Sequence, residues 1–193
     1  MFNFGFKEFD ADVALSGTPQ IWDINKLKKG LHGGGNPNSS CIGFNDGAPA
    51  LHLWSMIGNY EAVNLLVTRG AKVHYTDNHS RTSLQYACAA LNLENSSSAE
   101  LIVNLLIEKG AKLKTIKCKI CNNCSFNKRI TPLMWAAWAG NYFITNRLIN
   151  LGASTRVKDD AGNNALFYAK NPKLDHQTFD KNRVLTINLL EAN

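Results

Sequence analysis

Four short segments decide the fold of this chain, because each has the residues that open a helix: Pro49-Ala50-Leu51-His52, Thr82-Ser83-Leu84-Gln85, Thr131-Pro132-Leu133-Met134 and Asn164-Ala165-Leu166-Phe167. Thr is a favoured helix N-cap, and Pro fits the first helical turn. The first two segments are 33 residues apart, as are the last two, whereas 49 residues separate the second from the third. The sequence therefore predicts a helical unit with a period of 33 residues, interrupted by insertions.

A second motif follows each helix-opening segment. Its copies read Val63-Asn64-Leu65-Leu66, Val103-Asn104-Leu105-Leu106, Ile187-Asn188-Leu189-Leu190 and, more weakly, Thr145-Asn146-Arg147-Leu148. Three copies are followed shortly by the pairs Gly70-Ala71, Gly110-Ala111 and Gly152-Ala153. Glycine adopts the left-handed conformation that ends many helices. Each unit is therefore expected to contain two helices, the second ending at glycine.

The common phase, the helix-opening residues and the terminal Gly-Ala pairs together resemble the ankyrin repeat. The resemblance covers about residues 44–193. It implies an all-α solenoid of stacked helix-turn-helix units with β-hairpin fingers, in four repeats at about 44–76, 77–114, 115–158 and 159–193. Insertions fall near 91–98, before Thr131 and near 171–181. Segment 21–30 looks like a degenerate second helix ending at Gly30, so residues 1–43 are interpreted as a helical capping unit and a Gly-rich loop.

Three cysteines with two overlapping C-x-x-C spacings lie in the insertion before Thr131: Cys118, Cys121 and Cys124. This spacing can place three thiolates around one zinc ion. A structural zinc site needs a fourth ligand, and the ankyrin-like arrangement brings the preceding finger close, so the hypothesis takes His79 or His74 as that ligand. The alternative is a loop with three reduced cysteines and no metal, in which case the protein needs no cofactor.

The positive charge of the chain is concentrated in one stretch. The whole sequence has 21 Lys and Arg against 15 Asp and Glu, a formal charge of +6. Segment 109–129 contains no acid and seven cations: Lys109, Lys112, Lys114, Lys117, Lys119, Lys128 and Arg129. Phe126 is the single aromatic residue within it, whereas single-strand binders interleave several. Nucleic-acid binding is therefore not the favoured function, and a zinc-stabilised regulatory or nucleic-acid-binding module that uses 109–129 is kept as the alternative.

The resemblance implies binding of another protein through the concave groove and the finger tips. On the groove, Trp138, Met56 and Ile57 occupy positions that the family varies and turns outward, although core packing is nearly as good an interpretation for each. On the fingers, polar residues are expected to form the rim of the binding surface: Asn45, Asp46, Asn78, His79, Arg81, Asn127, Lys128, Asp160 and Asn163.

Catalytic motifs are missing from the sequence, so no enzymatic activity is expected. It contains no H-E-x-x-H, no G-x-S-x-G and no phosphate-binding loop. Cys88 occupies a small-residue position of a first helix, which favours buried packing over a nucleophilic role. His52 is the only residue to match the histidine of the family's T-P-L-H tetrapeptide, and we expect it to hold loop backbone.

The cellular setting is indicated only by composition. No run of 18 apolar residues occurs, and the opening segment lacks the features of a secretory signal, so we expect no membrane span. Five cysteines then suggest reduced thiols in the cytoplasm, in a protein expected to be monomeric. The 23 asparagines and irregular repeats resemble host-directed effectors of intracellular bacteria, which would act in the host cytosol. A protist scaffold or a viral ankyrin protein fits nearly as well.

Overall fold

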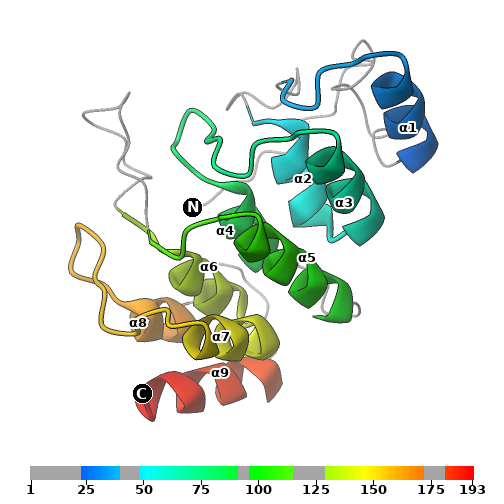
Figure 1. Cartoon of the computed structure of the whole chain (residues 1–193). Coiled ribbons are helices and arrows are strands. Elements are labelled where there is room, and N and C mark those ends of the chain that lie inside the picture. The colour runs from blue at the N-terminus through cyan, green and yellow to red at the C-terminus, as the bar shows by residue number, and fades with distance from the viewer. Residues whose placement is uncertain (1–22, 40–47, 91–95, 115–128, 172–180) are drawn as a thin grey trace.

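The computed structural model describes residues 23–39, 48–90, 96–114, 129–171 and 181–193. Within these ranges the secondary structure is helical, and four helix pairs follow a leading helix (Figure 1). The elements are α1 Ile24–His32, α2 Ala50–Ile57, α3 Tyr60–Thr68, α4 Ser83–Cys88, α5 Ser96–Glu108, α6 Pro132–Ala139, α7 Tyr142–Asn150, α8 Ala165–Lys170 and α9 Lys181–Glu191.

The first helix of each pair begins where the four segments predict. Thr82 and Thr131 cap α4 and α6, each accepting a hydrogen bond from the third helical N–H, and Pro132 lies in the first turn of α6. Asn164 caps α8 in the same way, whereas Pro49 precedes α2 without a side-chain cap. The predicted helix starts are therefore confirmed, and local capping chemistry accounts for three of the four.

The second helices also begin and end at recognisable residues. The turns after α3, α5 and α7 place Gly70, Gly110 and Gly152 at φ +91°, +93° and +88°, as the Gly-Ala pairs predict. The starts of α3 and α7 depend on a signal that the repeat motifs do not include. Asn59 and Asn141 follow a left-handed glycine and cap the next helix with their side chains.

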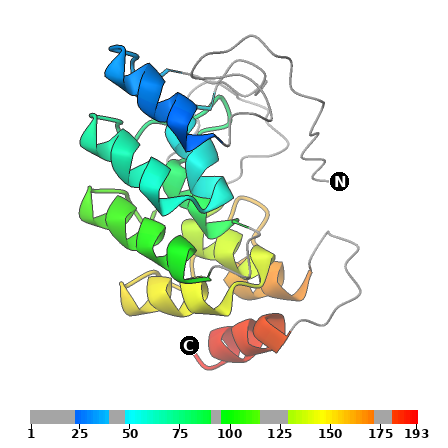
Figure 2. The same ribbon diagram turned by 90° about the vertical axis from the view of Figure 1, so that its right-hand side faces the viewer.

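The helices form two layers. In one layer α2, α4, α6 and α8 pack side by side, and in the other α3, α5, α7 and α9 do the same (Figure 2). The apolar core lies between the layers and includes Leu51, Leu66, Leu84, Leu106 and Leu148, all essentially buried. Each pair contacts its neighbours in sequence order, which confirms the predicted all-α repeat solenoid.

Helix α1 packs against α3 and thus continues the layer of second helices at the N-terminal end. The expectation that this helix stops at Gly30 is wrong, because it runs through Gly30 and ends at His32, with Gly33 as its C-cap. Arg69 fixes this end, since its Nη1 donates to the Leu31 carbonyl at 3.0 Å. The last carbonyls of a helix have no hydrogen-bond donor within the helix, and here Arg69 of the neighbouring repeat supplies one.

The predicted β-hairpin fingers are not confirmed as strands. Among the described residues, the extended pairing consists of one isolated antiparallel bridge between Thr76 and Thr82. The turns themselves are present, with Asp77 N–H donating to the Arg81 carbonyl and Asp159 N–H to the Asn163 carbonyl. The three insertions fall largely outside the described residues. No helix in the described ranges is long and apolar enough to span a membrane.

Candidate partner-binding surface

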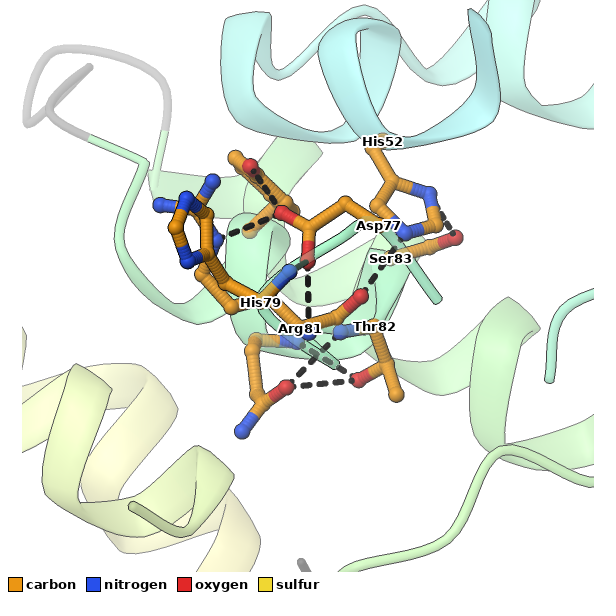
Figure 3. Close-up of polar contacts among 8 residues, drawn as sticks. His52, Asp77, His79, Arg81, Thr82 and Ser83 are labelled. Atoms are coloured by element: carbon orange, nitrogen blue, oxygen red, sulfur yellow. Dashed lines mark hydrogen bonds and ion pairs between the residues drawn. The ribbon is translucent and has the colours of Figure 1, made fainter. Parts of the chain in front are cut away.

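The finger after the first repeat is built around one buried carboxylate. Asp77 is 3% exposed, and its Oδ1 accepts hydrogen bonds from the backbone N–H groups of His79 and Arg81 at 2.9 and 2.8 Å. Its Oδ2 accepts from Arg81 Nε at 2.6 Å and from the Tyr86 hydroxyl at 2.8 Å (Figure 3). The Arg81 guanidinium also stacks on the Tyr86 ring. This segment, 77–81, is therefore fixed from inside by its own side chain.

The finger of the fourth repeat has the same construction. Asp159 accepts from the backbone N–H groups of Ala161 and Asn163 at 2.9 and 2.8 Å, and from the Tyr168 hydroxyl at 2.7 Å. Gly162 has φ +84°, and Ser80 at the equivalent position of the other finger has φ +59°. Asp159 therefore starts this turn and holds it by hydrogen bonds to its backbone.

Burial and hydrogen bonding act in opposite directions on Asp159. Burial disfavours its charged form, but the hydrogen bonds donated by Tyr168, Asn163 and Ala161 outweigh this effect and hold the pKa of the carboxyl below its usual value. Burial, together with the hydrogen bond to Asp159 and the charge of that carboxylate, raises the pKa of the Tyr168 hydroxyl. Asp159 is consequently ionised at neutral pH, and the turn keeps its shape.

Side chains from the first helices tie each finger to the preceding repeat. His52 Nε2 donates to the Arg81 carbonyl at 2.9 Å, and its Nδ1 lies 3.1 Å from the Ser83 hydroxyl (Figure 3). Burial lowers the pKa of His52 to about 4, so the ring is neutral at pH 7 and Nδ1 accepts from Ser83. The prediction that His52 holds loop backbone is confirmed.

Gln85 takes the same role one repeat further along the stack. Its Nε2 donates to the Ile130 carbonyl at 2.6 Å, just before α6, while its Oε1 accepts from the Thr82 N–H. Met134 holds this position in the third repeat, and its thioether cannot donate a hydrogen bond. An apolar pocket forms there instead, lined by Ile130, Met134, Trp135, Trp138 and Tyr168.

The structure corrects the groove anchor expected at Trp138. Trp138 is only 6% exposed and packs edge-on against Trp135, with ring centroids 5.8 Å apart. Arg183 of α9, in the layer of second helices, donates to the Trp138 carbonyl and so contacts the same residue from the other layer. Met56 and Ile57 are half-buried against the core. Position in the repeat predicted outward side chains, but the bulky indole is covered by its neighbours.

The finger residues divide into structural and exposed groups. Arg81 and Asn163 belong to the structural group, because the Arg81 side chain is 17% exposed in its ion pair with Asp77, and Asn163 Nδ2 donates to Asp159. Asn78 and Asp160 are exposed at equivalent tip positions, and half-buried His79 lies beside Asn78. Arg129 Nε donates to Asp160 Oδ1 at 2.6 Å in an exposed ion pair, which links the segment just before α6 to the finger of the fourth repeat.

Several predicted site residues lie outside the described ranges: Asn45, Asp46, Asn127, Lys128, Cys118, Cys121 and Cys124. His79 and His74 are described, with His74 exposed and in edge contact with Tyr75. The described residues contain no group of three His, Cys, Asp or Glu side chains that could hold a metal ion. The zinc site therefore stays a prediction.

Cys88 is fully buried in α4, and burial raises the pKa of its thiol well above the usual range. This confirms buried packing, since a thiol kept protonated and out of reach is a poor nucleophile. Asp77 and its hydroxyl partner Tyr86 are the key residues that motif reading missed. The recurring spacing of nine residues from Asp77 to Tyr86 and from Asp159 to Tyr168 is the sequence signal for them.

Comparison with protein families agrees with this geometry. The sequence model of the ankyrin repeat matches residues 46–78 and 128–160. These two ranges contain the pairs α2–α3 and α6–α7, whereas the pairs α4–α5 and α8–α9 are those whose helices are separated by insertions. Comparison with curated proteins gives no match. The two repeat matches, together with the two-layered stack of helix pairs, support an ankyrin repeat protein.

Proposed function

We propose that the protein binds another protein through its finger tips and the adjoining face of the first helices. Ankyrin repeats generally mediate protein–protein interaction. One observation carries the proposal for this chain: the fingers are held rigid from inside by Asp77 and Asp159, so their tips are not needed to keep the turns folded. A preorganised surface loses less conformational entropy when a partner binds.

The tip residues have the properties that such a surface needs. Asn78 is exposed, and its side chain makes no hydrogen bond with the described part of the chain. Ala161 is exposed at the tip of the fourth finger. The buried ionisable groups His52, Asp77 and Asp159, by contrast, are all occupied in structural contacts, which supports binding rather than chemistry as the function.

The test compares a tip variant with a matched control. Asn78→Lys with Ala161→Lys changes both tips, and Asn150→Lys with Asn188→Lys adds the same charge at exposed helical positions away from them. The immobilised proteins are incubated with a eukaryotic cell lysate, and the retained proteins are identified by mass spectrometry. Proteins retained by the wild type and the control but lost from the tip variant support the proposal. Identical retention by all three chains refutes it, provided that circular dichroism shows equal folding.

The finer proposal is that the partner is a protein of a eukaryotic host. It is supported by the asparagine-rich composition and the irregular repeats alone. Proximity labelling in transfected eukaryotic cells tests it separately from binding itself. Enrichment of the same host proteins by the wild type, but not by the tip variant, is expected. Labelling that does not differ between the two chains would contradict a host target at this surface.

A further inference from the structure

Three turns at one edge of the stack present cations without any acidic residue. They follow α3, α5 and α7, span 69–76, 109–114 and 151–158, and lie one above another where the second helices end (Figure 2). Their exposed cations define what we call the basic edge: Lys72, Lys109, Lys112, Lys114, Arg156 and Lys158. Arg69 also lies in these turns, but its guanidinium is engaged with α1. The excess charge thus extends beyond segment 109–129 to two other repeats.

The ion pairs of the described chain leave this edge uncompensated. The pairs join Lys28 to Glu61, Arg81 to Asp77, Arg129 to Asp160 and Lys170 to Glu191. None of these pairs includes a residue of the basic edge. The acids next to the edge in sequence are Glu108, the last residue of α5, and Asp159, which is buried and hydrogen-bonded within its own turn. Six like charges on stacked turns therefore face solvent together, which produces a positive potential along the edge.

Stabilisation of helix ends does not explain the pattern. A cation near a helix C-terminus interacts favourably with the macrodipole, and Lys109 directly after α5 benefits in this way. That effect fades beyond the last turn of a helix. Lys112, Lys114, Arg156 and Lys158 lie beyond the terminal glycines Gly110 and Gly152, so their charge needs another reason.

We infer that the basic edge binds an acidic segment of a partner protein, an inference that rests on the proposed protein-binding function. Two exposed apolar residues, Tyr75 and Val157, lie at equivalent positions in the first and third turns, 36% and 40% exposed. The edge thus combines positive charge with apolar contacts, the complement of a peptide that contains both acidic and apolar residues. Tyr75 is the one exposed large aromatic residue in the three turns, whereas single-stranded nucleic acids are bound on successive aromatic platforms.

The spacing of the turns also suits a polypeptide. Stacked helices are separated by about 10 Å. A chain in the polyproline II conformation advances about 3.1 Å per residue with three residues per turn, so every third residue lies on the same face and reaches the next turn. A peptide with an acidic residue at each third position can therefore pair with successive repeats. Apolar residues placed between the acids then contact the positions of Tyr75 and Val157.

The probe is a fluorescein-labelled peptide with five Glu-Glu-Leu units, and its matched control has Gln in place of Glu. Binding is measured by fluorescence anisotropy in 50 mM and 300 mM NaCl. We expect the acidic peptide to bind, the Gln peptide not to bind, and the affinity to fall at the higher salt concentration because exposed charges are screened.

Variants locate the binding on the molecule. Lys112→Gln with Arg156→Gln removes two charges from the basic edge. The control, Lys170→Gln with Lys181→Gln, removes two positive charges elsewhere, so the two variants have equal net charge. Exposed ion pairs contribute modestly, so we expect the edge variant to bind about threefold to tenfold more weakly and the control to match the wild type. Circular dichroism establishes that both variants are folded.

Three results would overturn the inference. They are no binding of the acidic peptide, equal weakening in the edge and control variants, or tighter binding of a 15-nucleotide oligo-dT that depends on the same edge residues. The last result would assign the edge to phosphates instead of a protein segment. The tip-variant capture experiment is independent of all three, so the proposed function can survive when this inference fails.

Discussion

Replacing Asp77 by Asn tests the idea that one buried carboxylate holds the finger after the first repeat. Asp77→Asn keeps Oδ1 for the N–H groups of His79 and Arg81 but replaces Oδ2 by an amide nitrogen. Arg81 Nε, now 2.6 Å from Oδ2, can only donate, so its bond is lost. The Tyr86 hydroxyl can reverse and accept from the new amide. Since a hydrogen bond to a charged group contributes about 1.5–3 kcal/mol, we expect a loss of about 2 kcal/mol in the free energy of unfolding.

The equivalent change in the fourth finger provides the matched control. Asp159 Oδ2 accepts from the Tyr168 hydroxyl and from Asn163 Nδ2, and no cation among the described residues bonds to it. Both partners can turn around and accept from an amide. Asp159→Asn is therefore expected to cost only about 0.5 kcal/mol.

Urea unfolding at pH 7 measures the difference. Circular dichroism at 222 nm and tryptophan fluorescence must give coincident transitions for each variant, because free energies are defined only for a two-state process. In an Arg81→Gln background, Asp77→Asn is expected to lose most of its effect, since the donor that it strands has been removed. Equal losses for the Asp77 and Asp159 variants, or an unchanged cost in the Arg81→Gln background, would refute this account of the finger.

Three further predictions follow from the site. The pKa of His52 is about 4 in the folded protein and about 6.5 in the unfolded chain, so the unfolded chain binds more protons between these two pH values. The contribution of His52 to the free energy of unfolding is therefore complete above pH 6.5 and falls by about 3 kcal/mol as the pH drops to 4. Urea titrations at several pH values should show this slope for the wild type, and a flatter one for His52→Gln. Gln85→Met strands the buried Ile130 carbonyl and should cost about 1–2 kcal/mol in the same assay; an unchanged midpoint contradicts the link. Trp138→Ala should cost about 3–5 kcal/mol, measured by thermal and urea unfolding, and a loss of partner capture at unchanged stability would restore Trp138 as a binding anchor.

Local chemistry explains why the sequence predicted the architecture well. Thr82, Thr131 and Asn164 cap helices through contacts within three residues, and Gly70 ends a helix through its own backbone freedom. These signals are read without knowledge of the fold. Their regular spacing then predicts the stack, because a single helix pair cannot bury its apolar face alone.

The candidate site was predicted less completely, because exposure depends on neighbours that the sequence does not show. Trp138 and Met56 occupy equivalent repeat positions, yet Trp138 is buried against Trp135 while Met56 is half-buried. Arg81 was expected to face a partner, but it is committed to Asp77. In both cases the repeat pattern predicted the position of the residue correctly, but it did not predict the neighbouring side chain, Trp135 or Asp77, that contacts it.

The sequence by itself thus determined the repeat period, the helix boundaries set by caps and glycines, and the structural role of His52. Tertiary structure alone decided which polar groups are structural and which are exposed, and it gathered cations from three repeats onto one edge. The physical reason is distance along the chain. Capping operates over a few residues, whereas the bond from His52 to Arg81 and the alignment of the turns 69–76, 109–114 and 151–158 exist only when the repeats stack.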